Sequence, residues 1–328
     1  MSGSDAIRTT GLTKTFGDLA AVDDLDLQVH TGEIFGFLGP NGAGKSTTIR
    51  MLLDQLRATS GSASVLGLDM HADSLQIRRR IGYLPGDLAL YPKLTGRQTI
   101  DYFANLRGGV DMRYVDELAE RLGADLSRKV REYSTGNRQK IGLIQAFMHK
   151  PELLILDEPN AGLDPLVQQT FQEMLREVRA DGRTVFLSSH TLSEVERVAD
   201  RVGIIRHARL VIVERVDALK RKAIRRLEFE FAEPVPADLF ADVDVVRELE
   251  IDGVHARVSY EGAVHPVLQA AMTRHVVDIH SREADLEEIF LDYYRDTDAD
   301  TGAAAAGART DVRRDSAKQG AASSGGTR

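Results

Sequence analysis

One glycine-rich loop carries the residues whose types and spacing point most directly to chemistry. It follows the pattern G-x-x-x-x-G-K-[ST], and its residues are Gly39, Pro40, Asn41, Gly42, Ala43, Gly44, Lys45 and Ser46. The glycines let the backbone curl so that successive N–H groups point at one phosphate, and the next helix presents its positive dipole end to it. We expect Lys45 to reach the β- and γ-phosphates of a nucleotide, Ser46 to ligate Mg²⁺, and Thr47 to belong to the same binding set.

Two carboxylates at the end of an apolar run form the second chemical element. Residues 153–156 read LLIL, and Asp157 and Glu158 follow them directly. Ligands of α/β sheets bind at the C-terminal ends of the strands, so this pair is expected near the phosphate loop. We predict that Asp157 holds Mg²⁺ through water and that Glu158 acts as general base on the attacking water.

Hydrophobic periodicity predicts the elements that position these residues. An apolar run at 34–38 predicts a buried strand that enters the loop, and 46–57 has the spacing of a helix. Strand-like and helix-like segments then alternate, which predicts an α/β core with a parallel sheet up to about residue 220. The strand-like segments are 5–30, 153–156, 184–188, 202–205 and 210–213, and the helix-like ones are 96–150 and 166–180.

Composition changes beyond the core and predicts three domains. Residues 1–220 form the nucleotide-binding domain, with a helical subdomain at about 88–150. A basic bridge at 219–226 is interpreted as a solvated helix face, with an anionic membrane surface as the lesser alternative. Residues 227–295 predict a small α+β appendage that ends in a helix, and 298–328 lack the apolar bulk to fold and are predicted to be disordered.

The overall composition excludes several classes of protein. The 328 residues carry a net charge of −8 and contain no Cys and no Trp. Thiolate metal sites, disulfide scaffolds and cysteine nucleophiles are therefore excluded, and a nucleic-acid partner is not expected. No apolar run approaches the roughly 18–20 residues of a membrane span, and the polar N-terminus is no signal peptide. We expect a cytoplasmic protein whose membrane role, if any, runs through a partner.

Further motifs give the chain a family resemblance. Together with Asp157 and Glu158, the segments YSTGNRQ at 133–139 and AGLD at 161–164 resemble the signature motif, Walker B motif and D-loop of ABC-type ATPases. His190 in FLSSH resembles the switch histidine of that family, and Phe16 in LTKTF resembles its adenine-stacking aromatic residue. The chain is most similar to ATP-binding subunits of antibiotic and multidrug exporters whose permease is a separate chain. The segment LEEIFL at 286–291 is similar to their C-terminal appendage.

This resemblance implies a fold and a mechanism. The fold would be a P-loop NTPase core of the ABC ATPase type with a helical signature subdomain. The cofactors would be ATP and Mg²⁺. Two copies, or a copy and a paralogue, would dimerise head to tail so that Ser134 and Gly136 of one close on the ATP of the other. Asp164 would communicate across that interface, and His190 would contact the γ-phosphate. A membrane permease would be the second partner and would hold the chain at the inner face of the membrane.

The sequence departs from the family pattern at a few positions. Gly86, followed by Asp87, stands where the family has a glutamine that contacts Mg²⁺. Either Asp87 replaces it, or the ligand role is lost and a hinge remains. Residues 88–97 are predicted to expose Leu88, Leu90 and Tyr91, either as a groove for a permease helix or as part of a packed subdomain. The other departures are Tyr133, Thr135, Asn137 and Asn160.

Two other functions compete with an exporter ATPase. A soluble ABC ATPase of the ribosome or of DNA repair would carry two motif sets or a long coiled-coil insertion, and this chain has one set and a negative net charge. A P-loop GTPase would need a base-reading N-K-x-D motif, which the sequence lacks, and a kinase would not need the signature at 134–139.

Overall fold

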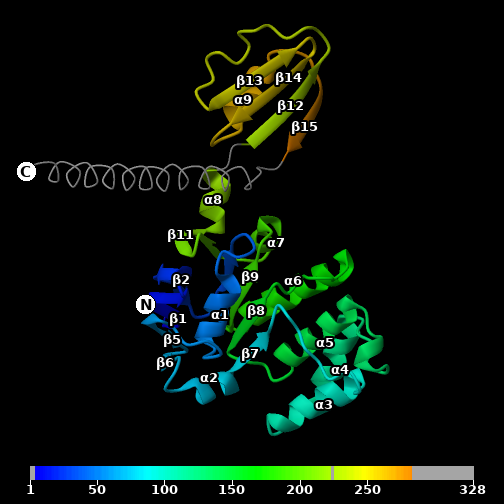
Figure 1. Ribbon diagram of the computed structural model, residues 1–328. Coiled ribbons are helices and arrows are strands. Elements are labelled where there is room, and N and C mark those ends of the chain that lie inside the picture. The colour runs from blue at the N-terminus through cyan, green and yellow to red at the C-terminus, as the bar shows by residue number, and fades with distance from the viewer. Residues whose placement is uncertain (1–3, 223–224, 283–328) are drawn as a thin grey trace, which may run out of the picture. The chain divides into compact units, whose positions relative to one another are not determined.

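The computed structural model describes residues 4–222 and 225–282, and the chain divides into two compact units after Ala218. The first unit contains every element of the predicted chemistry (Figure 1). Each unit is described by itself below. In the described ranges, no helix has the length and apolar character needed to cross a bilayer.

A six-stranded sheet runs through the first unit and confirms the predicted α/β core. Neighbouring strands pair in parallel, except that β10 and β11 form an antiparallel hairpin. Three of the four inner strands are buried along their whole length because they are built mostly from apolar residues without alternation. In spatial order the strands are β11 (Arg209–Arg215), β10 (Arg201–Arg206), β4 (Ile34–Leu38), β9 (Thr184–Ser189), β8 (Leu153–Asp157) and β7 (Ile81–Leu84).

A second sheet of five antiparallel strands forms the other layer of this unit. Its apolar face shares one core with the parallel sheet, in which Ile7 and Val29 of one sheet join Phe35 and Phe37 of the other. The alternation at 5–30 predicted strands there, but it did not reveal that they leave the parallel sheet. The strands are β1 (Asp5–Phe16), β2 (Leu19–Leu25), β3 (Gln28–His30), β5 (Ser60–Val65) and β6 (Leu68–Asp69).

The helix after the phosphate loop is shorter than its apolar spacing predicts. Helix α1 (Lys45–Leu52) ends well before residue 57 because Asp54 adopts a left-handed φ of 51°. The guanidinium of Arg78 then donates to the carbonyl oxygens of Leu53 and Asp54, which α1 leaves without helical partners. The other helices beside the two sheets are α2 (Ser74–Arg80), α6 (Pro165–Ala180) and α7 (Leu192–Glu196).

Three helices gather at one end of the unit, within the range predicted for the helical subdomain (Figure 1). They are α3 (Gly96–Leu106), α4 (Met112–Arg121) and α5 (Thr135–Phe147), with the short 3₁₀ helix η1 (Val130–Glu132) before α5. Helix α5 packs closely on β7 because Gly82 of the strand and Gly142 of the helix lack side chains. A Cβ on Gly82 would lie 2.1 Å from the carbonyl oxygen of Ala146, and one on Gly142 would lie 2.6 Å from Leu84.

The second unit is an antiparallel sheet with one described helix wholly inside it and another that crosses its boundary. Leu227, Phe229 and Phe231 alternate along one strand and bury their side chains in a small core. The predicted basic helix face at 219–226 is only partly right, since the helix ends at Lys222 and a strand starts at Arg225. The elements are α8 (Val216–Lys222), which begins before the boundary, then β12 (Arg225–Phe231), β13 (Val246–Asp252), β14 (His255–Tyr260), α9 (His265–Ala271) and β15 (Val276–Arg282).

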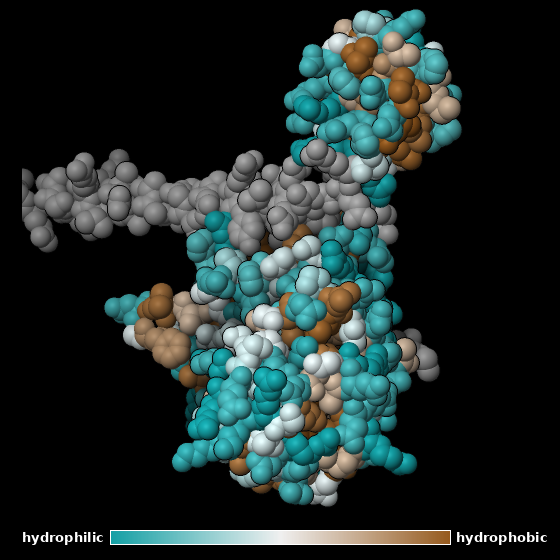
Figure 2. Space-filling view, turned by 90° about the vertical axis from the view of Figure 1, so that its right-hand side faces the viewer, coloured by the Kyte–Doolittle hydropathy of each residue, from teal (hydrophilic) through white to brown (hydrophobic). Residues whose placement is uncertain are grey.

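The surface of this second unit is mixed. Met272, Val277 and Ile279 are exposed apolar residues. Figure 2 shows a stripe of brown, apolar surface among teal on the side of the unit that it displays. The predicted terminal helix of the appendage and the predicted tail at 298–328 lie outside the described residues.

Candidate functional site

Three neighbouring strands of the parallel sheet end at one edge, and each is followed by residues of the predicted site. β4 leads into the phosphate loop, β8 ends on Asp157 and is followed by Glu158, and β9 is followed by His190. The strands lie in the order β4-β9-β8, so residues far apart in sequence meet at their C-terminal ends. The amide of Gly39 donates to the carbonyl oxygen of Ser189 at 3.2 Å and links two of these strand ends.

The phosphate loop has a conformation that requires its glycines. Gly42 and Gly44 have φ angles of 81° and 114°, which favour glycine. A Cβ on Gly44 would also lie 2.5 Å from the carbonyl oxygen of Ala21. The Lys45 side chain is buried and donates to the carbonyl oxygen of Gly39 at 2.6 Å. A loop of this shape, which carries a buried cation and opens a helix, fits the phosphates of a nucleotide.

The structure brings the three predicted catalytic residues into contact. The Glu158 carboxylate has Oε1 3.2 Å from the Lys45 Nζ and Oε2 2.8 Å from the His190 Nδ1. Glu158 itself has a left-handed φ of 49°, which is uncommon for a residue with a side chain. The turn immediately after β8 thus places a carboxylate between an ammonium group and an imidazole ring, beside the phosphate loop.

Asp157 provides a buried carboxylate at the same edge. Its Oδ1 accepts a hydrogen bond of 2.5 Å from the Ser188 hydroxyl. Burial, together with the Asp157 charge, raises the pKa of the neighbouring Tyr83 to about 12, so this phenol stays neutral at physiological pH. Ser46, in the first turn of α1, and Asp157 offer the hard oxygen ligands that suit Mg²⁺. An Mg²⁺ ion bound by these two residues would take its remaining ligands from water and phosphate.

Gly86 lies against this carboxylate. A Cβ on Gly86 would be 3.1 Å from Oδ2 of Asp157, so the loop after β7 approaches the candidate metal ligand with no side chain of its own. Asp87 is exposed. Its substitution for the missing glutamine therefore stays a prediction, as does the alternative that the ligand role is lost.

The predicted signature and D-loop residues form a second group. The Ser134 hydroxyl caps α5 by accepting from the amide of Asn137, and Asp164 caps α6 by accepting from the amide of Val167. Gly136 packs against Gly162, whose carbonyl oxygen would lie 2.6 Å from a Cβ on Gly136. These contacts join the two motifs to each other and not to the phosphate loop of the same chain.

Phe16 lies apart from both groups, at the end of β1. Its ring is 52% exposed. The Nζ of Lys14 lies 5.0 Å from the centre of the ring and makes a cation–π contact on it. A half-exposed aromatic ring can stack on a base, as the family resemblance implies for Phe16.

Two departures from the family signature have partners within the chain. The Tyr133 hydroxyl accepts from the amide of Gly96 at 3.2 Å and ties the start of α5 to α3. The Asn137 side chain accepts from the amide of Asp125 and donates to its carbonyl oxygen, both at 2.9 Å. These side chains brace the helical group around the signature loop.

Sequence reasoning missed two residues that hold the carboxylate turn. Ser188 contacts Asp157 as described above, and its hydroxyl also accepts from the amide of Glu158 at 3.1 Å. The buried amide of Gln139, on α5, donates to the carbonyl oxygens of Glu158 and Pro159 at 3.3 and 3.0 Å. Gln139 ends the signature segment and Ser188 lies in the FLSSH segment, but these roles cannot be predicted from sequence, because they arise only through strand pairing and helix packing.

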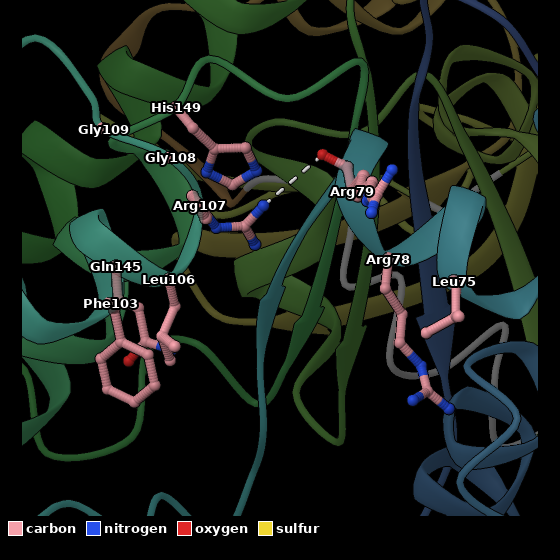
Figure 3. A pocket seen from close by; sticks show the side chains of 10 residues that line it. All are labelled: Leu75, Arg78, Arg79, Phe103, Leu106, Arg107, Gly108, Gly109, Gln145 and His149. Atoms are coloured by element: carbon pink, nitrogen blue, oxygen red, sulfur yellow. Dashed lines mark hydrogen bonds between the residues drawn. The ribbon is translucent and has the colours of Figure 1, made fainter.

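A groove of about 770 Å³ lies between α2 and the helical group. Figure 3 shows the α2 side chains on one side and those of α3 and α5 on the other. The ten lining residues of this described region include three arginines and no carboxylate, and they are Leu75, Arg78, Arg79, Phe103, Leu106, Arg107, Gly108, Gly109, Gln145 and His149.

None of the lining residues of this groove falls in the segment 88–97, so a permease groove at 88–97 stays a prediction. Tyr91 is 50% exposed and packs edge-on against Tyr102 of α3, with ring centres 5.4 Å apart. Leu88 and Leu90 are only half-buried, so the expectation that all three side chains are exposed is wrong for these two. Leu88 instead packs on Gly142, where α5 leaves room for it.

His149 is neutral in this groove. Its Nε2 donates to the carbonyl oxygen of Ile81 at 3.0 Å, since a carbonyl can only accept. Burial, with the charge of Arg107 as a second cause, lowers the pKa of His149 to about 4. Within the described residues, Nδ1 of His149 and Oε1 of Gln145 are buried acceptors without a hydrogen-bond partner.

The chain is similar to known proteins over its first unit. The family model for "ABC transporter" matches residues 22–161. The bacitracin transport ATP-binding protein BcrA of Bacillus licheniformis is 39% identical over 233 residues, which cover 70% of this chain and 76% of that protein. A solved ATP-binding subunit of an ABC transporter is 29% identical with a TM-score of 0.60, and the match covers 66% of this chain and 92% of that one. A dimeric bacterial ABC transporter cassette, 21% identical over 64% of this chain and 98% of its own, has a TM-score of 0.59 and supports the fold.

His149 should make stability pH-dependent. Its folded pKa of about 4 lies below the ordinary value of 6.5, so the unfolded chain takes up a proton that the folded chain does not. This contribution to the unfolding free energy is present above pH 6.5 and is lost as the pH falls toward 4, with a slope of at most about 1.4 kcal/mol per pH unit.

The measurement is urea unfolding of the wild type and of His149→Gln at several pH values from 7.5 to about 4.5. Between pH 6.5 and 4.5 the wild type should lose more unfolding free energy than the variant. A stability difference that stays constant across this range would contradict the assignment.

Proposed function

The chain belongs to the ABC transporter family, and we propose that it is the ATP-hydrolysing subunit that drives an exporter whose membrane part is a separate chain. The observation that carries this proposal is the contact of Glu158 with Lys45 and His190 at the mouth of the phosphate loop. A carboxylate, a lysine and a histidine that meet at a phosphate loop are suited to the hydrolysis of a phosphoanhydride bond.

Each residue of this edge has a task that its geometry supports. Lys45 neutralises the β- and γ-phosphates once they replace Glu158 as its partner. Glu158, released from Lys45, accepts a proton from the attacking water. His190 orients Glu158 through Nδ1 and presents its other nitrogen to the γ-phosphate. Ser46 and Asp157 would hold an Mg²⁺ ion, which would supply charge stabilisation for the phosphoryl group.

A second copy of the chain, or a paralogue, would complete the site. Ser134 and Gly136 lie at the start of α5, where a hydroxyl and free helix N–H groups favour an anion. Gly136 lies against Gly162 and Ser134 caps α5, and among the described residues no hydrogen bond is seen between either of them and the phosphate loop of the same chain. We propose that they close on ATP bound by another copy in a head-to-tail dimer, with Asp164 and the neighbouring Gly162 at the contact between the copies.

The transported compound is proposed from similarity. The relative from Bacillus licheniformis is named for bacitracin transport. A related antibiotic, drug or lipophilic compound is the substrate class that we propose for the exporter. The alternative of a soluble ABC ATPase on the ribosome or on DNA is not favoured, because the chain has one motif set and a net charge of −8.

The groove between α2 and α3 is the place where we propose that a cytoplasmic helix of the permease docks. The groove is lined by the apolar side chains of Leu75, Phe103 and Leu106, and Arg79 adds a positive charge to the lining. A short amphipathic helix with one acidic side chain among apolar ones fits this combination. Such docking would hold the chain at the inner face of the membrane and would connect the permease to the loop that carries Gly86.

The catalytic assignment is tested with Glu158→Gln. This change keeps the shape of the side chain but removes its basicity, so ATP binding should persist while steady hydrolysis falls at least about 100-fold. Size-exclusion chromatography with ATP and Mg²⁺ should show an ATP-dependent dimer that the wild type forms only transiently. Turnover of Glu158→Gln at the wild-type rate would refute Glu158 as the base.

The docking groove is tested with a charge reversal, Arg79→Glu. Tagged chain is purified from membranes of its native cells, and the multispanning protein that accompanies it is identified by mass spectrometry. The reversal should sharply reduce the amount of that protein recovered, because it repels the proposed acidic side chain. Arg113→Glu, on the exposed surface of α4, is the matched control and should leave recovery unchanged. Equal recovery with all three chains would exclude this groove as the docking site.

A further inference from the structure

Ser188 lies at the centre of the catalytic edge, two residues before His190 in the FLSSH segment, and no role is predicted for it from the sequence. It lies on β9, in register with Phe37 of β4 on one side and with Asp157 of β8 on the other. Its side chain is fully buried, with 0% exposure. The serine is therefore fixed between the strand that enters the phosphate loop and the strand that delivers the carboxylates.

The Ser188 hydroxyl makes one bond to each carboxylate residue. It accepts from the amide of Glu158 at 3.1 Å, so its own hydrogen is free to point at Oδ1 of Asp157, 2.5 Å away. With Oδ1 engaged, Oδ2 is the Asp157 oxygen left for a ligand. Oδ2 is also the Asp157 atom closest to Gly86, since a Cβ on that glycine would lie 3.1 Å from it.

The same hydroxyl supports the unusual backbone of Glu158. A left-handed φ of 49° at a residue with a side chain persists only where its surroundings hold it. Ser188 holds the amide of this residue, and Gln139 holds its carbonyl oxygen. The turn aims the Glu158 carboxylate at Lys45 and His190, so the direction of the base depends on the two bonds that clamp its peptide groups.

We propose that Ser188 is a positioning residue for ATP hydrolysis, which selects the Asp157 oxygen offered to the metal and fixes the turn that aims Glu158. The inference rests on the proposed ATPase function. Ser188 does not contact nucleotide or water. It acts through Asp157 on metal binding and through Glu158 on the chemical step, so its loss should weaken metal affinity and lower kcat while the bare phosphate loop still binds nucleotide.

The decisive experiment measures metal affinity apart from activity. Mn²⁺ serves as the probe, and the free ion is followed by electron paramagnetic resonance in the presence of a non-hydrolysable ATP analogue. For Ser188→Ala we expect the Mn²⁺ Kd to rise at least about 10-fold, the usual cost of losing a residue that orients a metal ligand. The Kd of the analogue in EDTA should change less than about 2-fold.

Two further variants separate positioning from folding. Ser188→Thr keeps the hydroxyl and should retain most of the Mn²⁺ affinity, whereas Ser188→Cys keeps the volume with a weak donor and should lose it. Thr184→Val removes a buried hydroxyl at the other end of β9, where it accepts from the amide of Gly32, and should leave the Mn²⁺ Kd unchanged.

The outcomes distinguish this proposal from the function on which it rests. A wild-type chain that neither binds the analogue nor hydrolyses ATP would overturn the proposed function. If the wild type is active, and Ser188→Ala and Ser188→Cys have the same Mn²⁺ affinity and kcat as the wild type, only the proposed role of Ser188 is overturned. If Thr184→Val loses as much Mn²⁺ affinity as Ser188→Ala, the losses reflect the stability of β9 in general, and the proposed role of Ser188 is also overturned.

Discussion

Parallel pairing of three adjacent strands is the constraint on which the site depends. β4, β9 and β8 run in the same direction, so the segments after them emerge at one edge of the sheet. Lys45, Glu158 and His190 come from distant parts of the sequence and meet there because the register aligns the strand ends. Both faces of these three strands are buried, which keeps the strands in the core of the unit.

The helical group is tied to this edge by packing and by hydrogen bonds. Gly82 and Gly142 allow α5 to approach β7 closely, and Gln139 on the same helix holds the backbone after Glu158. The helix that begins with Ser134 therefore reaches the turn that carries the base. A movement of the helical group would shift Glu158, which gives a physical route between the docking groove that we propose and the catalytic edge.

The sequence predicted the residues that carry the chemistry better than the residues that hold them in place. The phosphate loop and the Asp157-Glu158 pair could be found because their function depends on a fixed local order of residues. The roles of Ser188 and Gln139 could not be predicted, since a hydrogen bond across strands or from a helix leaves no local pattern in the sequence. The separate antiparallel sheet and the end of α1 at Leu52 were missed because they depend on tertiary pairing and on a left-handed residue. The half-burial of Leu88 reflects a glycine 54 positions away on α5, which periodicity cannot reveal.

We propose that the signature residues of one copy complete the ATP site at the phosphate loop of another copy. Mixing two inactive variants, Lys45→Ala and Ser134→Ala, tests it most directly. Each variant alone would form dimers with two defective sites, whereas a mixed dimer has one intact site. With random pairing at equal concentrations, ATPase activity should return to about a quarter of the wild-type value. A mixture no more active than the two variants measured separately would contradict completion of the site by a second copy.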